Sequence, residues 1–352
     1  SVISSALFGA LAGSGALPFE RASYLEVIRA GGKGADASAR TFDAAFRRAQ
    51  AGDAAPLSEP AHSRPKAVVP ASAHDHRLGS LLVRLRQELP EATQLMAYAG
   101  LRKVVDYQDL AYGQEYLDIL KRLHGVDRDC AGSEKDYLFT NASAKYLANA
   151  MTYDDVIRVA DLKTRASRRE RIEREMSLGK DQVLQTTEFM HPRMEEIAGM
   201  LPARLGRWIE ARPRLFHWLD RRISKGRRVQ TYSIYWFLGL YVVGGLRGMR
   251  RRSLRHAAEV THRDEWLKTA TDAVRSNYQL GVEILQCRRL IKGYSDTHAR
   301  GLSKFDQVIS AIKLIETRAD AADWARRLRD AALKEGTGRE LEGTIQTIKT
   351  FA

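Results

Sequence analysis

The sequence has 352 residues, a formal net charge of +14 and two cysteines, Cys130 and Cys287. Two thiols so far apart exclude a disulfide framework and a cluster held by four cysteines of this chain, and they favour a reducing, cytoplasmic location. The positive charge favours an anionic partner without choosing among nucleic acid, an acidic protein, a phosphate-bearing ligand and a membrane surface.

The first segment, residues 1–50, predicts two helices. One spans residues 4–17 and ends before a proline, and the other spans residues 20–30 and ends at a glycine-rich run. The segment starts with Ser and has no basic region before its apolar run, which disfavours a signal peptide and indicates a start inside a longer protein. Because large apolar side chains are few, we expect this segment not to form a stable domain alone.

A linker and a helical body follow. Residues 51–76 contain four prolines among Ala, Ser and His, a composition that predicts a linker. Residues 77–352 carry apolar side chains at helical spacing, as at Leu81 and Leu85, and no proline follows Pro213. We therefore predict an all-α fold, a multi-helix bundle with long helices.

Two of these helices are expected to be long. One is predicted over residues 252–291, and another from an N-cap at Thr140 or Asn141 through Leu162. Two further helices are expected at residues 303–315 and 321–333, and one weak strand at residues 183–187.

The most apolar stretch is residues 232–246, with Arg228 before it and Arg250 after it. A membrane-spanning helix needs roughly 20 apolar residues, and this run is shorter, so no membrane span is predicted. A buried core helix is favoured over a helix that contacts a membrane surface. Burial of Trp236 and Phe237 would distinguish the two.

Charged residues lie close to the apolar stripe of a predicted helix over residues 153–165. Asp161 and Arg165 are four residues apart, so they can form an ion pair on one helix face. Two interpretations stay open: a pocket whose arginines bind a carboxylate or phosphate, or a structural ion-pair network. The candidates are Tyr153, Asp155, Arg158, Asp161, Lys163 and Arg165.

Two more polar clusters are candidates. His191 precedes a proline at a turn and is either an acid–base group or a capping residue; no second His or Cys at ligand spacing supports a metal site. Asp296, His298 and Arg300 lie in a glycine-bounded run that is either a functional loop or a helix start with Asp296 as N-cap.

Recognised catalytic and nucleic-acid motifs are absent. The sequence has no dinucleotide or Walker glycine pattern, no nucleophile elbow, no zinc protease motif and no nucleic-acid module. The arginine-rich runs leave one alternative function open: a basic helical binding module for an acidic protein, nucleic acid or a membrane surface.

Six segments, in order along the chain, resemble a known family. They are residues 1–19 (SVISSALFGALAGSGALPF), 28–33 (IRAGGK), 106–112 (DYQDLAY), 155–168 (DVIRVADLKTRASR), 187–196 (TEFMHPRMEE) and 292–301 (KGYSDTHARG). Together they resemble the beta subunit of bacterial indolepyruvate oxidoreductase, one of the 2-oxoacid:ferredoxin oxidoreductases. The resemblance covers almost the whole chain.

This resemblance implies an organisation and an activity. Residues 1–50 would be the C-terminal helical tail of an α/β gamma-type domain that begins upstream, and residues 77–352 a helical C-terminal domain. The reaction would be oxidative decarboxylation of an arylpyruvate to an acyl-CoA and CO₂, with CoA as cosubstrate and electrons passed to ferredoxin or a similar acidic carrier. Thiamine diphosphate and iron–sulfur clusters would be bound by a partner alpha subunit, none by this chain, which would be inactive alone. The resemblance assigns no catalytic residue.

Overall fold

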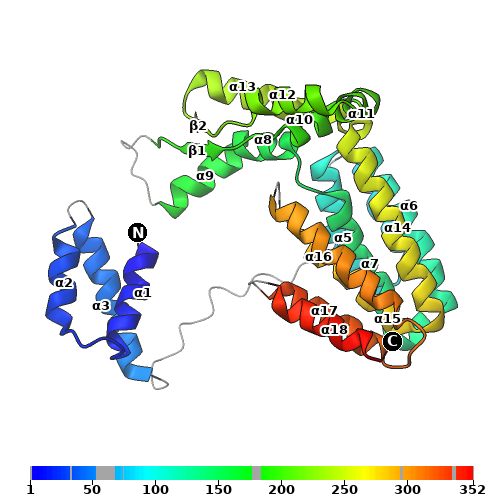
Figure 1. Ribbon diagram of the computed structural model, residues 1–352, viewed down its shortest axis with the longest axis horizontal. Coiled ribbons are helices and arrows are strands. Elements are labelled where there is room, and N and C mark those ends of the chain that lie inside the picture. The colour runs from blue at the N-terminus through cyan, green and yellow to red at the C-terminus, as the bar shows by residue number, and fades with distance from the viewer. Residues whose placement is uncertain are drawn as a thin grey trace. The chain divides into compact units, whose positions relative to one another are not determined.

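The computed structural model describes residues 2–31, 34–52, 68–73, 75–176, 184–293, 296–334 and 338–351. The chain forms two compact units, Ser1–Ala67 and Val68–Ala352. The predicted all-α, multi-helix fold is confirmed, because the described residues form helices joined by turns, with one two-stranded sheet (Figure 1). Most of the predicted linker over residues 51–76, namely residues 53–67 and residue 74, lies outside the described residues.

The first unit contains a small core of its own. Its helices in the described part of the chain are α1 (Val2–Gly13), α2 (Arg21–Arg29) and α3 (Ala35–Ala51). Tyr24 of α2 and Phe42 of α3 are buried against each other, with ring centroids 5.8 Å apart. Gly9 lets α1 approach the backbone of Phe42, where a Cβ would collide with the carbonyl oxygen. The sequence predicts two helices here, and the third, α3, was missed although Phe42 and Phe46 have helical spacing.

The second unit has a main core and a smaller layer beside it. The main core is built by α4 (His76–Glu88), α5 (Glu91–Tyr107), α6 (Leu110–Asp129), α7 (Leu138–Met151), α14 (Leu254–Ser276), α15 (Tyr278–Cys287), α16 (Asp296–Lys313), α17 (Ala321–Leu333) and α18 (Arg339–Lys349), with short 3-10 turns at Gly132–Lys135 and Arg288–Leu290. The predicted helices at residues 303–315 and 321–333 are confirmed by α16 and α17.

The layer lies across the top of this unit in Figure 1. It consists of α8 (Val156–Thr164), α9 (Ala166–Glu175), β1 (Thr187–Met190), α10 (Met194–Met200), α11 (Ala203–Glu210), α12 (Pro213–Ile223), β2 (Arg227–Gln230), α13 (Ile234–Gly245) and the 3-10 segment η3 (Leu246–Arg252). β1 and β2 pair antiparallel, with Phe189 opposite Arg228. The weak strand predicted at residues 183–187 is therefore misplaced: only Thr187 belongs to β1, and residue 183 lies outside the described residues.

The single long helix predicted over residues 252–291 is wrong. The chain turns at Asn277, which ends α14 and caps α15 by accepting a hydrogen bond from the Leu280 amide at 3.1 Å. An Asn side chain that binds nearby backbone amides favours a helix start over a helix interior. α15 then folds back on α14, and Gly281 leaves room for Val274.

The helix predicted from Thr140 or Asn141 through Leu162 is also wrong. α7 begins earlier, and both the amide and the hydroxyl of Thr140 donate to the buried Asp127 carboxylate, at 2.8 and 2.6 Å. α7 ends at Met151, and a new helix, α8, starts after Asp155, whose carboxylate accepts a hydrogen bond from the Arg158 amide at 2.6 Å. The break places Asp155 at a helix N-terminus, where a carboxylate is favoured.

Candidate functional site

Four helices of the second unit turn their N-terminal ends toward one cavity of about 320 Å³. The helices are α8, α10, α14 and α16, which come from distant parts of the sequence. The polar walls are formed by Asp154 and Asp155 before α8, Arg193 and Glu196 at α10, Arg255 in α14 and His298 in α16. These side chains make one side of the cavity polar.

His298 lies buried at the start of α16, next to an ionised carboxylate. Its Nε2 is 3.2 Å from Oε1 of Glu259, and Nη2 of Arg255 lies 2.8 Å from the same nitrogen. Nε2 donates to Glu259 when it carries a proton and accepts from Arg255 when it does not. The interpretation of residues 292–301 as a helix start holds for His298, which lies in the first turn of α16 rather than in a loop. Residues 294 and 295 lie outside the described residues.

Glu259 is held ionised by its neighbours. Burial acts to raise its pKa, but the hydrogen bond from His298 and the charges of Arg255 and Arg288 lower the pKa to about 2. Arg255 Nη2 is 2.7 Å from Oε1, and Arg288 Nη2 is 3.1 Å from Oε2. A carboxylate that both arginines stabilise fixes the position of the imidazole beside the cavity.

Asp154 is the contrasting acid of the cavity. Within the described residues its carboxylate makes no hydrogen bond or ion pair, and burial raises its pKa although Lys103 and Arg158 act in the opposite direction. Burial also lowers the pKa of Lys103, whose Nζ donates to Asn149 Oδ1 at 2.7 Å. The cavity thus contains a half-buried carboxyl group whose charge is not neutralised by direct contact.

Asp155 of the cavity wall is bound by a buried arginine, Arg250. Arg250 Nε lies 2.8 Å from Asp155 Oδ2, and Arg250 Nη1 donates to the Tyr107 carbonyl at 2.8 Å and to Gln108 Oε1 at 3.0 Å. The guanidinium also lies over the Tyr107 ring, 4.1 Å from its centroid. These contacts connect α5, η3 and the N-terminus of α8, so Asp155 has a structural role in holding α8 in place.

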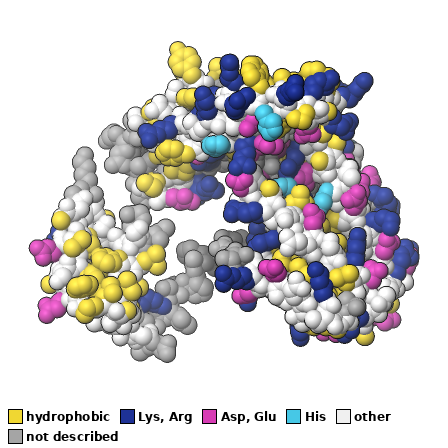
Figure 2. Space-filling model, in the orientation of Figure 1, with side chains coloured by type: hydrophobic (Ala, Val, Ile, Leu, Met, Phe, Trp, Pro, Cys, Tyr) yellow, Lys and Arg dark blue, Asp and Glu magenta, His cyan; other side chains and the backbone are white. Residues whose placement is uncertain are grey.

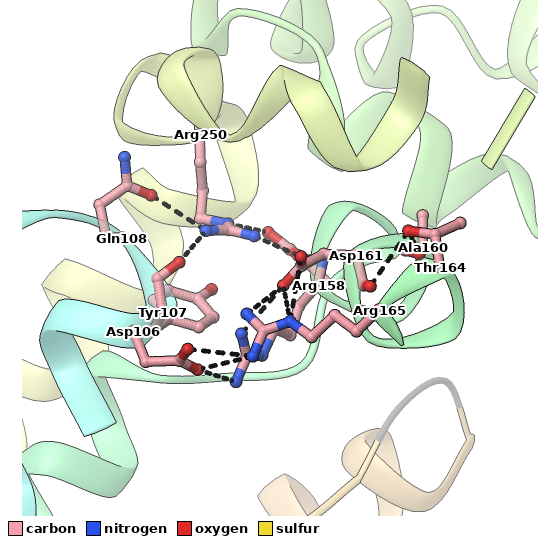
Figure 3. A network of polar contacts seen from close by, with 10 residues as sticks. Asp106, Tyr107, Gln108, Arg158, Ala160, Asp161, Thr164, Arg165 and Arg250 are labelled. Atoms are coloured by element: carbon pink, nitrogen blue, oxygen red, sulfur yellow. Dashed lines mark hydrogen bonds and ion pairs between the residues drawn. The ribbon is translucent and has the colours of Figure 1, made fainter. Parts of the chain in front are cut away.

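Arg158 and Arg165 belong to an ion-pair network. This is one of the two interpretations that the sequence left open; the other was a pocket that binds a carboxylate or phosphate. Figure 3 shows both guanidinium groups directed at the Asp106 carboxylate, at 2.9 Å from Arg158 and 3.0 Å from Arg165. Asp161 binds both as well, at 3.1 and 2.6 Å. Two arginines with two aspartates leave no net charge, which speaks against a pocket that binds an anion through these arginines.

The other predicted site residues are dispersed. Tyr153 is buried with its hydroxyl 3.1 Å from His256 Nδ1, and Lys163 pairs with Glu188. His191 lies exposed after β1, Asp296 pairs with Arg193 at 2.6 Å on the surface, and Arg300 is exposed on α16. Of the ten candidates, the cavity therefore brings together Asp155 and His298.

Several residues at the site were missed from the sequence. Arg255 and Glu259 are four apart on α14, a spacing that predicts an ion pair. Asp106 lies in segment 106–112, which carries the resemblance, but it was not among the predicted site residues. The sequence around Arg250 does not predict its burial, because a run of arginines is more typical of a solvated surface than of a buried ion pair.

A second feature is an exposed apolar surface. The sequence favours burial of residues 232–246, and this prediction is wrong: none of the α13 side chains is buried. Tyr235 is 86% exposed, Trp236 37% and Phe237 40%. α13 packs on α8 along one side, where Gly244 approaches the backbone of Asp161. Figure 2 shows hydrophobic and basic (Lys or Arg) side chains interspersed along the edge formed by α11, α12 and α13.

Metal sites and membrane-spanning helices were both sought in the described part of the chain. No group of three or more His, Cys, Asp or Glu side chains there could hold a metal ion. No helix there is long and apolar enough to cross a membrane.

The described residues define an all-α protein with a polar cavity at converging helix ends. Residues 93–311 match the model of a family of unknown function, DUF6537, and the chain belongs to this family. The match includes every residue named above as a wall of the cavity. No curated protein and no solved structure matches the sequence.

Proposed function

We propose that this chain is a non-cofactor-bearing part of a 2-oxoacid oxidoreductase of the indolepyruvate type, and that its helical unit binds the cofactor-bearing partner. The proposed activity rests on the family resemblance of the six segments. It is oxidative decarboxylation of an arylpyruvate to an acyl-CoA in the cytoplasm, with electrons passed to ferredoxin. Thiamine diphosphate and iron–sulfur clusters belong to the partner alpha subunit in this proposal, and CoA is the cosubstrate.

The proposed docking role is supported mainly by the exposed surface of α13. This helix has no charged residue from Ile234 to Gly245 and no buried side chain, and arginines follow at Arg247, Arg251 and Arg252. A contiguous apolar patch of this kind typically marks an interaction site. Aromatic and arginine side chains are also the residues enriched at protein interfaces.

The positions of the resembling segments support a common site. Segment 155–168 supplies Asp155, segment 187–196 supplies Arg193, and segment 292–301 supplies His298, all at one cavity. Segment 106–112 supplies Asp106 to the adjacent ion-pair network. Segments that are distant in sequence thus meet in one region of the second unit.

Co-purification with the alpha subunit tests the proposal. We expect the full chain to be retained by the immobilised alpha subunit and to be inert alone with indolepyruvate, CoA and thiamine diphosphate. Replacing two exposed α13 residues, Tyr235→Ser with Leu238→Ser, should weaken retention at least tenfold, as loss of an interface hot spot does. A control, Val83→Ser with Leu95→Ser, changes two other exposed apolar residues, 48% and 45% accessible, and should leave retention unchanged. Equal retention of both double variants would contradict the docking role.

A second candidate function rests on the exposure of Trp236 and Phe237. Tryptophan and tyrosine beside arginine suit the boundary of an anionic membrane, where the ring lies among apolar chains and the cation among phosphates. This candidate predicts that the chain sediments with vesicles containing anionic lipid at low salt and is released as salt increases. Absence of binding at low salt would eliminate it.

A further inference from the structure

The cavity contains two groups of opposite charge whose binding capacity the described residues use only in part or not at all. The carboxylate of Asp154 is half-buried and makes no hydrogen bond or ion pair within those residues. Arg255 hydrogen-bonds only through Nη2; its Nε is buried without a partner, and its Nη1 bonds to none of the described residues. Because charged groups taken out of water require partners, Asp154 lacks a cationic group, whereas Arg255 is already paired with Glu259 through Nη2 and keeps the N–H donors of Nη1 and Nε unused by the described residues.

Three other charged groups of the walls are engaged by neighbours, and Glu195 lies exposed. Asp155 is bound by Arg250, and Arg193 pairs with Asp296. The Glu196 side chain accepts from the Arg193 amide at 3.3 Å in the capping box of α10. The Asp154 carboxylate and the unused N–H donors of Arg255 therefore remain as the two groups that one ligand can engage together.

The remaining wall is apolar, and the volume is small. Val156, Met200 and Ala299 line this wall. Gly199 of α10 also lines the cavity and adds no side chain to it. A volume of about 320 Å³ lies at the lower end of the roughly 300–1,000 Å³ typical of small-molecule pockets. This size suits one small molecule rather than a nucleotide-sized ligand such as CoA.

We propose that the cavity is a binding site for an α-amino acid with an apolar side chain. The ammonium group pairs with Asp154, the carboxylate binds Arg255 beside His298, and the side chain packs on Val156 and Met200. A 2-oxoacid has the carboxylate but no ammonium group, so it leaves Asp154 unpaired. The site is thus distinct from a substrate site for the oxoacid, and it does not depend on the proposed oxidoreductase function.

Calorimetric titration of the full chain with three ligands of one side chain tests the assignment. The ligands are L-phenylalanine, phenylpyruvate, which lacks the ammonium group, and phenethylamine, which lacks the carboxylate. We expect L-phenylalanine to bind at least tenfold more tightly than either, because each lost charge-assisted contact costs about tenfold to a hundredfold in affinity.

Two variants locate the binding. Asp154→Asn removes a carboxylate that makes no hydrogen bond or ion pair within the described residues, so the fold should persist while L-phenylalanine affinity falls at least tenfold to that of phenylpyruvate. Met200→Trp fills the cavity and should abolish binding of all three ligands. The control, Glu265→Gln, makes the same charge change on the exposed side of α14 and should leave every affinity unchanged.

Four outcomes overturn the proposal. They are equal affinity for L-phenylalanine and phenylpyruvate, equal affinity for L-phenylalanine and phenethylamine, unchanged L-phenylalanine binding in Asp154→Asn, and no binding of any ligand to the folded chain. The first two identify a site for an oxyanion or for an amine alone.

Discussion

Arg250 binds Asp155 across 95 positions of sequence, with Nε 2.8 Å from Oδ2 and both side chains buried. The pair joins the carboxylate that caps α8 to η3, which follows the exposed helix α13. The N-terminus of α8, which borders the cavity, and the segment after α13 are therefore held by one contact. The cavity and the exposed helix α13 are thus linked through this ion pair.

We predict that Arg250→Met lowers the free energy of unfolding of the full chain by about 3–5 kcal/mol, because it leaves the Asp155 carboxylate buried without its partner. Urea denaturation followed by circular dichroism measures this change. Arg251→Met is the matched control: Arg251 pairs with Glu115 at an exposed position, 41% accessible, so the change should stay within about 1 kcal/mol. Similar losses in both variants would contradict the structural role of Arg250.

Glu259 should make stability depend on pH in the acid range. Its pKa in the folded chain is about 2, below the ordinary value of 4.5. A lowered pKa means that its contribution is fully present above the ordinary value and is lost as pH falls from about 4.5 toward 2. Glu259→Gln should therefore cost about 3–5 kcal/mol at pH 7 and nothing near pH 2. A pH-independent difference between the two proteins would refute the assignment.

Asp154 should behave in the opposite way. Because burial raises its pKa above the ordinary 3.8, the folded chain favours the protonated acid, and this contribution is lost as pH rises through the raised pKa. Asp154→Asn should stabilise the ligand-free chain at pH 7, by less than about 1 kcal/mol because the carboxyl is partly solvated. Thermal unfolding at pH 7 and at pH 3 checks this, and a destabilised variant at pH 7 would count against an unpaired carboxylate.

Gly281 is required by the close packing of α15 on α14. A Cβ at this position would lie 2.8 Å from Cα of Val274, so Gly281→Ala forces the two helices apart. The expected cost is about 1–3 kcal/mol, measured by urea denaturation. Gly343→Ala, on α18 where nothing lies near the added methyl group, should be neutral or slightly stabilising.

Helical periodicity was enough to predict the fold class and the helices at α16 and α17, since their apolar residues repeat at three and four positions. The helix breaks were not predictable from periodicity, because periodicity does not show where side chains such as Asn277 and Asp155 cap a new helix. The exposure of α13 was missed for a related reason. An apolar run predicts burial, but it does not tell whether the chain itself or a partner covers it.

The candidate site was predictable only in part. Asp155 could be singled out as a charged residue beside the apolar stripe of a predicted helix, and His298 as part of a possible helix start, yet nothing in their spacing predicts that they line one cavity. That meeting depends on the packing of α8, α10, α14 and α16, which involves contacts between residues more than 100 positions apart, such as Arg193 and Asp296. Periodicity within a segment carries no information about such contacts.

The most direct test of the proposed function is the rate of CoA-dependent oxidation of indolepyruvate, with ferredoxin as acceptor, by the alpha subunit mixed with the full chain. We predict that neither protein turns over alone, that the mixture does, and that Tyr235→Ser with Leu238→Ser reduces the rate at limiting concentration at least tenfold while Val83→Ser with Leu95→Ser does not. Full activity of the alpha subunit without this chain, or full activity of the mixture containing the α13 variant, would contradict the account.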